Sequence, residues 1–247
     1  MNAFDVFGYF KNEHKDTAMP ITLKDISWVD FFSRAEHSVF LCGGELRTSA
    51  DKDIADKCVA ILKEKFKSNP NFCVSIMGGS WLIEGGKAPK GDDPIINYTL
   101  QGLYSMAKDN PSYNIWFYYN PLNVAEATEV GYLHNVIIDE GEATQVAYIE
   151  YPHGCPGKNK HYENREWLYS QDSEFATDVI RIRDNFCSNL GIQRQSIIDA
   201  YQKVKEWTLR DFYKETKMWR YTKPFGFSLC LRLWLLGFTR LPKLMNQ

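Results

Sequence analysis

The chain has 247 residues, with 29 Lys/Arg and 31 Asp/Glu, so its formal net charge is −2. Hydrophobic residues at 44% and charged residues at 24% are ordinary globular values and exclude wholesale disorder. The charge is unevenly spread, because residues 201–247 hold ten basic against three acidic residues. That segment carries +7, leaves −9 on residues 1–200, and holds ten of the 36 aromatic side chains.

Targeting and cysteine patterns predict a cytoplasmic protein. The N-terminus lacks the basic and apolar regions of a secretory signal, and no segment reaches the roughly 20 apolar residues that span a bilayer. Six widely spaced cysteines without a C-x-x-C pair favour free thiols in a reducing compartment. No phosphate loop, G-x-G-x-x-G, G-x-S-x-G or H-E-x-x-H motif is present, so no cofactor and no metal are expected.

The first half of the chain predicts alternating strands and helices. Residues 1–24 are mixed and polar and predict a leader that runs over the surface. Apolar runs bounded by glycine or proline then predict strands, and apolar residues at helical spacing predict helices. The strands are expected at Ser38–Cys42, Phe72–Met77 and Tyr113–Tyr119, and the helices at Trp28–Arg34, 52–67 and 96–107.

The second half predicts a hairpin and two further helices. Strands Asn135–Asp139 and Gln145–Tyr151 follow a helical turn near 122–131, and their short connection predicts an antiparallel pair. A loop over 152–166 leads to a helix over 172–189, with Asp172 or Ser173 as its cap, and a last helix runs from Ile197 to about 218.

This order predicts an α/β fold with a mixed, mostly parallel central sheet, helices on both faces, and a C-terminal helical and hydrophobic extension. The expected divisions are a leader over 1–24, the α/β domain over 25–191, and the C-terminal helix with its basic aromatic tail over 192–247.

Polar and small residues follow each predicted strand, where ligands collect in open α/β sheets. Glycine pairs at these ends would allow close approach of a ligand, although turn formation explains them equally well. The candidate ligand-binding residues are Gly43, Gly44, Glu45, Gly78, Gly79, Ser80, Tyr119 and Asn120.

Four residues near the predicted hairpin are candidates for acid–base or nucleophilic chemistry. His134 and His153 each border a strand of the hairpin, and Asp139 and Glu150 are the acids of its strand ends. A surface or hydrogen-bonded histidine is the competing interpretation, because histidine takes many structural roles.

Three segments resemble parts of the phospholipase D-like family. Trp28–Cys42 resembles its opening helix and strand, Leu133–Glu150 resembles its catalytic hairpin, and Asp172–Asn189 resembles its closing helix. The resemblance covers about residues 26–191 and implies that family's fold. The family's enzymes use H-x-K-x-x-x-x-D, with a histidine that forms a phosphoenzyme and a lysine that holds the phosphate.

The catalytic pattern is incomplete in this sequence. If Asp139 takes the aspartate position, His134 falls at the lysine and Tyr132 at the histidine. A two-residue slip restores His134 as the nucleophile and places Val136 at the lysine. The resemblance therefore implies a degenerate member, and it also implies a homodimer, because the family needs two such halves for each active site.

Several functions remain open at this point. A ligand- or partner-binding protein is favoured by the missing lysine, and a phosphodiesterase or nuclease using His134 and nearby acids is the enzymatic alternative. Glu126–Asn135 also loosely resembles the Glu-x-Gly-x-Ala segment of nucleoside deoxyribosyltransferase-like and TIR-like glycosidases, which implies a nucleoside-directed hydrolase.

The tail gives a third possibility, because residues 214–243 mix aromatic side chains with seven basic residues. Packing on the acidic body or on a second subunit is the first expectation, and contact with a protein partner or an anionic membrane surface is the alternative. Nucleic acid is less favoured, since the sequence pI is about 6.2.

Overall fold

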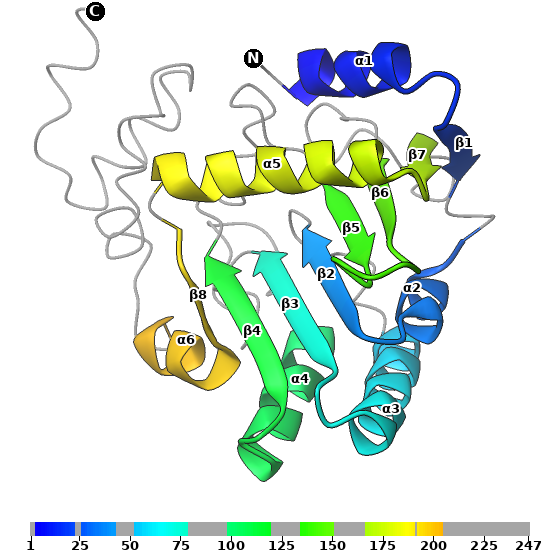
Figure 1. Cartoon of the computed structure of the whole chain (residues 1–247). Helices are drawn as coiled ribbons and strands as arrows, with labels where there is room; N and C mark the ends of the chain where they lie inside the picture. The colour runs from blue at the N-terminus through cyan, green and yellow to red at the C-terminus, as the bar shows by residue number, and fades with distance from the viewer. Residues whose placement is uncertain are drawn as a thin grey trace, which may run out of the picture.

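The computed structural model describes residues 3–22, 26–42, 52–78, 98–119, 134–150, 166–190 and 192–204. Eight strands form one sheet in the order β1-β7-β6-β5-β2-β3-β4-β8 (Figure 1). The strands are β1 (Met19–Thr22), β2 (Ser38–Cys42), β3 (Cys73–Gly78), β4 (Asn114–Tyr119), β5 (Asn135–Ile138), β6 (Val146–Glu150), β7 (Glu166–Ser170) and β8 (Arg194–Ser196).

Six helices are described beside this sheet. They are α1 (Ala3–Glu13), α2 (Trp28–Arg34), α3 (Lys52–Ser68), α4 (Tyr98–Asp109), α5 (Ser173–Leu190) and α6 (Ile197–Val204). Strands β2, β3 and β4 run parallel, whereas the remaining pairings are antiparallel. The structure therefore confirms the α/β class and the mixed sheet that the sequence predicts.

Side-chain alternation along the strands builds two cores, one on each face of the sheet. Val39, Val74 and Ile115 point to the face covered by α2, α3, α4 and α6. Phe40 and Met77 point to the opposite face, where they join apolar side chains of α5 and α1. In Figure 1, α3 and α4 lie behind the sheet, and α5 crosses in front of its upper part.

The predicted helices and strands between Trp28 and Ser68 match the structure to within a residue. A capping box at the start of α2 explains its sharp beginning, because Ser27 accepts from the Asp30 N–H and Asp30 accepts from the Ser27 N–H. At α5, Asp172 is the capping residue, since its Oδ1 accepts the N–H groups of Glu174 and Phe175.

The structure differs from the prediction at the N-terminus. Residues 3–22, expected as a surface leader, form α1 and β1. Val6, Phe7 and Phe10 of α1 are buried against the α5 side of the sheet. Strands β7 and β8 are not predicted either, because both are short and neither has a long apolar run.

Other predicted segments lie outside the described residues: the helical turn near 122–131, the loop over 152–166 up to residue 165, the last helix beyond residue 204, and the tail over 214–243. Glu166, predicted as the end of that loop, is the first residue of β7. Among the helices that the structure describes, none is both long and apolar enough to cross a membrane.

Helices α3 and α4 approach each other closely at a glycine. A Cβ atom built on Gly102 of α4 would lie 2.3 Å from Cγ2 of Val59 on α3. Real Cβ atoms do not come this close, so the spacing of the two helices depends on the absence of a side chain at position 102.

Candidate functional site

The two ends of the β5–β6 hairpin bring a histidine and a glutamate together. His134 immediately precedes β5, Glu150 is the last residue of β6, and the Glu150 N–H donates to the His134 carbonyl at 2.9 Å. The side chains meet between His134 Nδ1 and Glu150 Oε2 at 2.6 Å. The Glu150 side chain is 5% exposed and the His134 ring is 22% exposed, so the carboxylate is buried behind a ring that solvent reaches.

This pair lies at the carboxyl edge of the parallel strands. Cys42, the last residue of β2, pairs with Asn135, the first residue of β5. His134 therefore lies beyond the end of β2, where open α/β sheets place their ligands. By alternation, its side chain shares a sheet face with Val136 and Tyr148, the face covered by α2 and α3.

The geometry gives the imidazole a defined chemistry. When Nδ1 carries the proton and donates to Glu150, Nε2 presents a lone pair away from the carboxylate. That nitrogen can accept a hydrogen bond, take a proton or attack an electrophile, and the doubly protonated ring can donate to an anion. The carboxylate fixes the orientation of the ring, as in other carboxylate–histidine pairs.

Asp139 lies at the other end of the hairpin. Five residue steps separate it from His134, which is about 17 Å at the usual rise of a strand. Its buried carboxylate accepts the backbone N–H groups of Glu36, His37 and Ser38 and the hydroxyl of Thr144. The structure thus joins His134 with Glu150 and separates both from Asp139.

The remaining candidates divide between the carboxyl edge and the undescribed segments. Gly78 and Tyr119 end β3 and β4 and pair with each other at the edge that also carries the His134–Glu150 pair. The other candidates lie outside the described residues: Gly43, Gly44, Glu45, Gly79, Ser80, Asn120 and His153.

Val136, two residues after His134, is 1% exposed and belongs to the apolar core beneath α2 and α3. It therefore offers no charged group to a ligand at this edge. Within the described ranges, no three His, Cys, Asp or Glu side chains come together in an arrangement that could hold a metal ion.

His134 and Glu150 are each predicted as site residues, but the contact between them is not predicted. Their equal distance from the hairpin turn is the signal, because residues equally spaced from a tight turn lie opposite each other. Arg194, which contacts Cys73 of β3, is not among the predicted site residues, because the strand that carries it is not predicted.

No family model matches the chain, and no curated protein matches its sequence. Solved structures do match, at low identity. The archaeal chromatin protein TrmBL2, described with a novel mode of DNA binding, is 8% identical with a TM-score of 0.40, over 74% of this chain and 57% of that one. Phosphatidylserine synthase of Haemophilus influenzae Rd KW20 is 10% identical with a TM-score of 0.45, over 83% and 45%.

NucT from Helicobacter pylori is 15% identical with a TM-score of 0.36, over 68% of this chain and 93% of that one. The chain thus spans about half the length of the first two structures.

Proposed function

We propose that this chain is a ligand-binding protein with a phospholipase D-like fold and a degenerate catalytic motif. Its ligand site is the carboxyl edge of the sheet around the His134–Glu150 pair. The observation that carries the proposal is this pair, in which a buried carboxylate contacts a partly exposed imidazole at the carboxyl edge of the sheet.

The loss of phosphodiester cleavage follows from the side chains beside the pair. Cleavage of a phosphodiester needs a cation to hold the phosphate while negative charge develops. In one alignment His134 itself takes the lysine position, and in the other the buried Val136 takes it. In both alignments the His134 imidazole can bind polar groups such as hydroxyl or phosphate oxygens, but the second, cationic side chain that cleavage requires is missing.

The first experiment measures turnover and binding on the same preparation. We expect no hydrolysis of bis-p-nitrophenyl phosphate above background, together with a shift of the His134 ring signals in NMR when inorganic phosphate is added. Glu150→Gln should reduce the shift, because the ring then loses the charge-assisted hydrogen bond to the carboxylate and is held less firmly. His37→Gln is the matched control, since His37 is exposed.

A hydrolase is the second candidate, and the 2.6 Å contact to Glu150 supports it, because a carboxylate-backed histidine is suited to nucleophilic or general-base work. Turnover that is abolished by His134→Ala but retained by His37→Gln would overturn the binding proposal. Absence of both turnover and a phosphate-dependent shift would remove phosphate from the ligands proposed for this edge.

Homodimer formation, a cytoplasmic location and the partner of residues 214–243 are proposals as well. Sedimentation with anionic liposomes, compared between the full chain and a chain ending at residue 212, separates the roles of the tail. Loss of sedimentation with unchanged stability would favour a membrane surface, whereas loss of folding would favour packing of the tail on the body or on a second copy. Sedimentation equilibrium measures the oligomeric state directly.

A further inference from the structure

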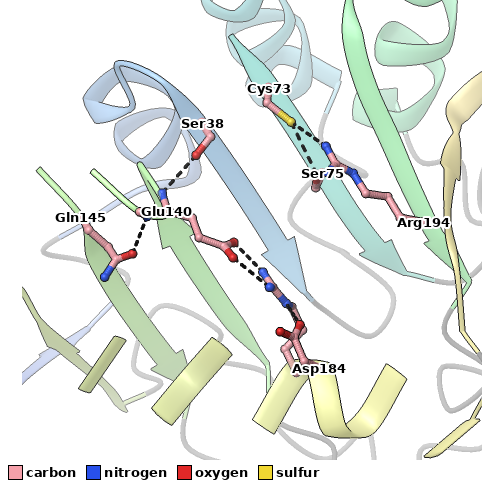
Figure 2. Close-up of polar contacts among 9 residues, drawn as sticks. Ser38, Cys73, Ser75, Glu140, Gln145, Asp184 and Arg194 are labelled. Carbon is pink, nitrogen blue, oxygen red and sulfur yellow. Dashed lines mark hydrogen bonds and ion pairs between the residues drawn. The ribbon is translucent and has the colours of Figure 1, made fainter. Parts of the chain in front are cut away.

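Arg194 lies across the face of the sheet opposite the His134 ring. Its side chain starts on β8, passes over β4 with the guanidinium carbon 4.5 Å from the ring centroid of Trp116, and donates from Nη2 to Cys73 Sγ at 3.0 Å. Figure 2 shows it reaching across to Cys73 and Ser75 of β3. Stacking and hydrogen bonding hold the guanidinium in place, which lowers the entropy that ligand binding would cost.

The charge of Arg194 is not balanced by the described part of the protein. On α5, Arg181 pairs with Asp178, and Arg183 pairs with Glu140 and Asp184. Arg194 makes no ion pair with any described residue, and the thiol of Cys73 is a weak acceptor. The exposed guanidinium therefore keeps several donors for an anion.

Hydroxyl groups lie beside this cation on the same sheet face. In the register of the parallel strands, Ser75 stands between Phe40 and Trp116, so a short polar side chain lies between two large rings. Ser75 is 8% exposed, and its Oγ lies 3.8 Å from Cys73 Sγ. Its hydroxyl lies on the sheet face that the Arg194 side chain crosses.

Tyr118 is the register partner of Arg194 and is half-buried. Burial raises the pKa of its phenol above the ordinary value, while the charges of Arg194 and Arg183 act in the opposite direction. The phenol therefore remains protonated at neutral pH and can donate. The charges of both guanidinium groups act on the same phenol.

The face around Arg194 is accessible among the described elements. In Figure 1, α5 crosses the upper part of the sheet and leaves the lower halves of β3 and β4 uncovered by any described helix. Cys73 and Trp116 are partly exposed, and Arg194 is exposed.

We propose that Arg194, with Ser75 and Tyr118, binds a tetrahedral oxyanion such as a phosphate group. The guanidinium group supplies charge-assisted hydrogen bonds to two oxygens of the anion. The hydroxyl groups supply hydrogen bonds to its further oxygens, which a carboxylate does not have. This site goes beyond the proposed function, because it lies on the α5 side of the sheet and uses none of the residues at the His134 edge.

The alkylation rate of the Cys73 thiol can report whether an anion is bound at Arg194, because Cys73 contacts Arg194. Alkylation of Cys73 by iodoacetamide is followed by peptide mass spectrometry while inorganic phosphate is increased at constant ionic strength. We expect saturable slowing of Cys73 alkylation with phosphate and with sulfate. Arg194→Gln should weaken this protection about tenfold, the usual effect of losing a charge-assisted contact.

Arg181→Gln is the matched control, because Arg181 is an exposed arginine that is paired with Asp178. It should leave the protection of Cys73 unchanged. Arg194→Lys keeps the charge without the fork and should give intermediate protection, and circular dichroism checks the fold of each variant. The proposal is overturned if phosphate leaves the wild-type rate unchanged, if Arg194→Gln retains full protection, or if acetate protects as well as phosphate.

Discussion

The Asp139 carboxylate accepts the backbone N–H of Ser38 at 2.9 Å, which ties the last residue before the hairpin turn to the first residue of β2. The Ser38 hydroxyl in turn accepts the N–H of Glu140, so the two segments hold each other in both directions (Figure 2). These contacts satisfy the N–H groups that β2 would otherwise leave unpaired at its start. They indicate that Asp139 aligns β2 with β5.

Replacing Asp139 should therefore lower stability and leave the His134 edge intact. Asp139→Asn removes one acceptor oxygen and keeps the backbone conformation, since asparagine tolerates the positive φ of 54° at this position. We expect a loss of about 2 kcal/mol in the free energy of unfolding, measured in urea. Glu142→Gln in the same turn should change it by less than about 0.5 kcal/mol, because Glu142 is exposed. An equal effect of the two substitutions would contradict this role of Asp139.

Two glycines in helices should respond to alanine in opposite directions. Gly102→Ala places a methyl group against Val59 and should destabilise the protein by about 1–3 kcal/mol. Gly8→Ala meets nothing within 4 Å and should stabilise it by up to about 1 kcal/mol through helix propensity. Thermal unfolding of both variants, and of Gly102→Ala combined with Val59→Ala, checks the argument. Failure of the second substitution to restore stability would show that the contact with Val59 is not the cause.

The ion pair between Arg183 and Glu140 joins α5 to the hairpin turn. Arg183 is 9% exposed, donates to both Glu140 oxygens at 2.6 and 2.9 Å, and lies 4.9 Å above the Phe40 ring. Glu140→Gln should cost about 1–3 kcal/mol, because among the described residues it leaves the exposed Asp184 as the one charged partner of a buried guanidinium.

Adding Arg183→Met to Glu140→Gln should recover much of this loss, since a buried cation is then removed together with its partner. Urea unfolding of the single and double variants gives the coupling energy. Asp184→Asn, at a side chain that is 61% exposed, should have little effect. Additive losses in the double variant would refute this account of the pair.

Asp178 should make the stability sensitive to acid. Burial raises its pKa, but hydrogen bonds from Tyr9 and His14, together with the charge of Arg181, outweigh burial and leave the pKa below its ordinary value. A carboxyl whose pKa is lowered by folding contributes stability above its unfolded pKa of about 3.9 and loses it as the pH falls through the folded pKa.

The substitution Asp178→Asn should therefore cost about 1 kcal/mol at neutral pH and progressively less below about pH 4. Urea unfolding across that range, with Asp16→Asn as an exposed control from the same region, measures the effect. A stability difference that stayed constant down to pH 2 would contradict the assignment.

Much of the fold could be predicted from local pattern, and the misses have physical causes. The apolar runs of β2 and β3 are buried on both faces, so their composition alone indicates strands. Strand β8 has only three residues, none of them a large apolar side chain, and exists because it pairs with β4. In α1, Phe7 and Phe10 are buried in a core that α5 and the sheet strands supply, all of them far away in the sequence.

The candidate site was predictable in part. Its residues could be named because His134 and Glu150 border the strands of a recognisable hairpin, but their contact depends on register. The separation of Asp139 was implicit in the same hairpin, since His134 and Asp139 stand at opposite ends of β5. The contact between Arg194 and Cys73 could not be predicted, because it joins residues that are 121 positions apart across an outer strand.

The register of the β5–β6 hairpin limits how the length of the turn over residues 140–145 can change. Asn135 pairs with Ile149, so His134 and Glu150 meet on one face of the sheet. A one-residue slip of β6 against β5 would turn every side chain of β6 over and send Glu150 toward α5, whereas a two-residue slip would keep the face but bring another residue opposite His134. The turn can therefore vary in sequence with little effect on the His134–Glu150 pair. A change in the length of the turn that shifts the register would separate the two side chains, although the turn lies at the opposite end of the hairpin.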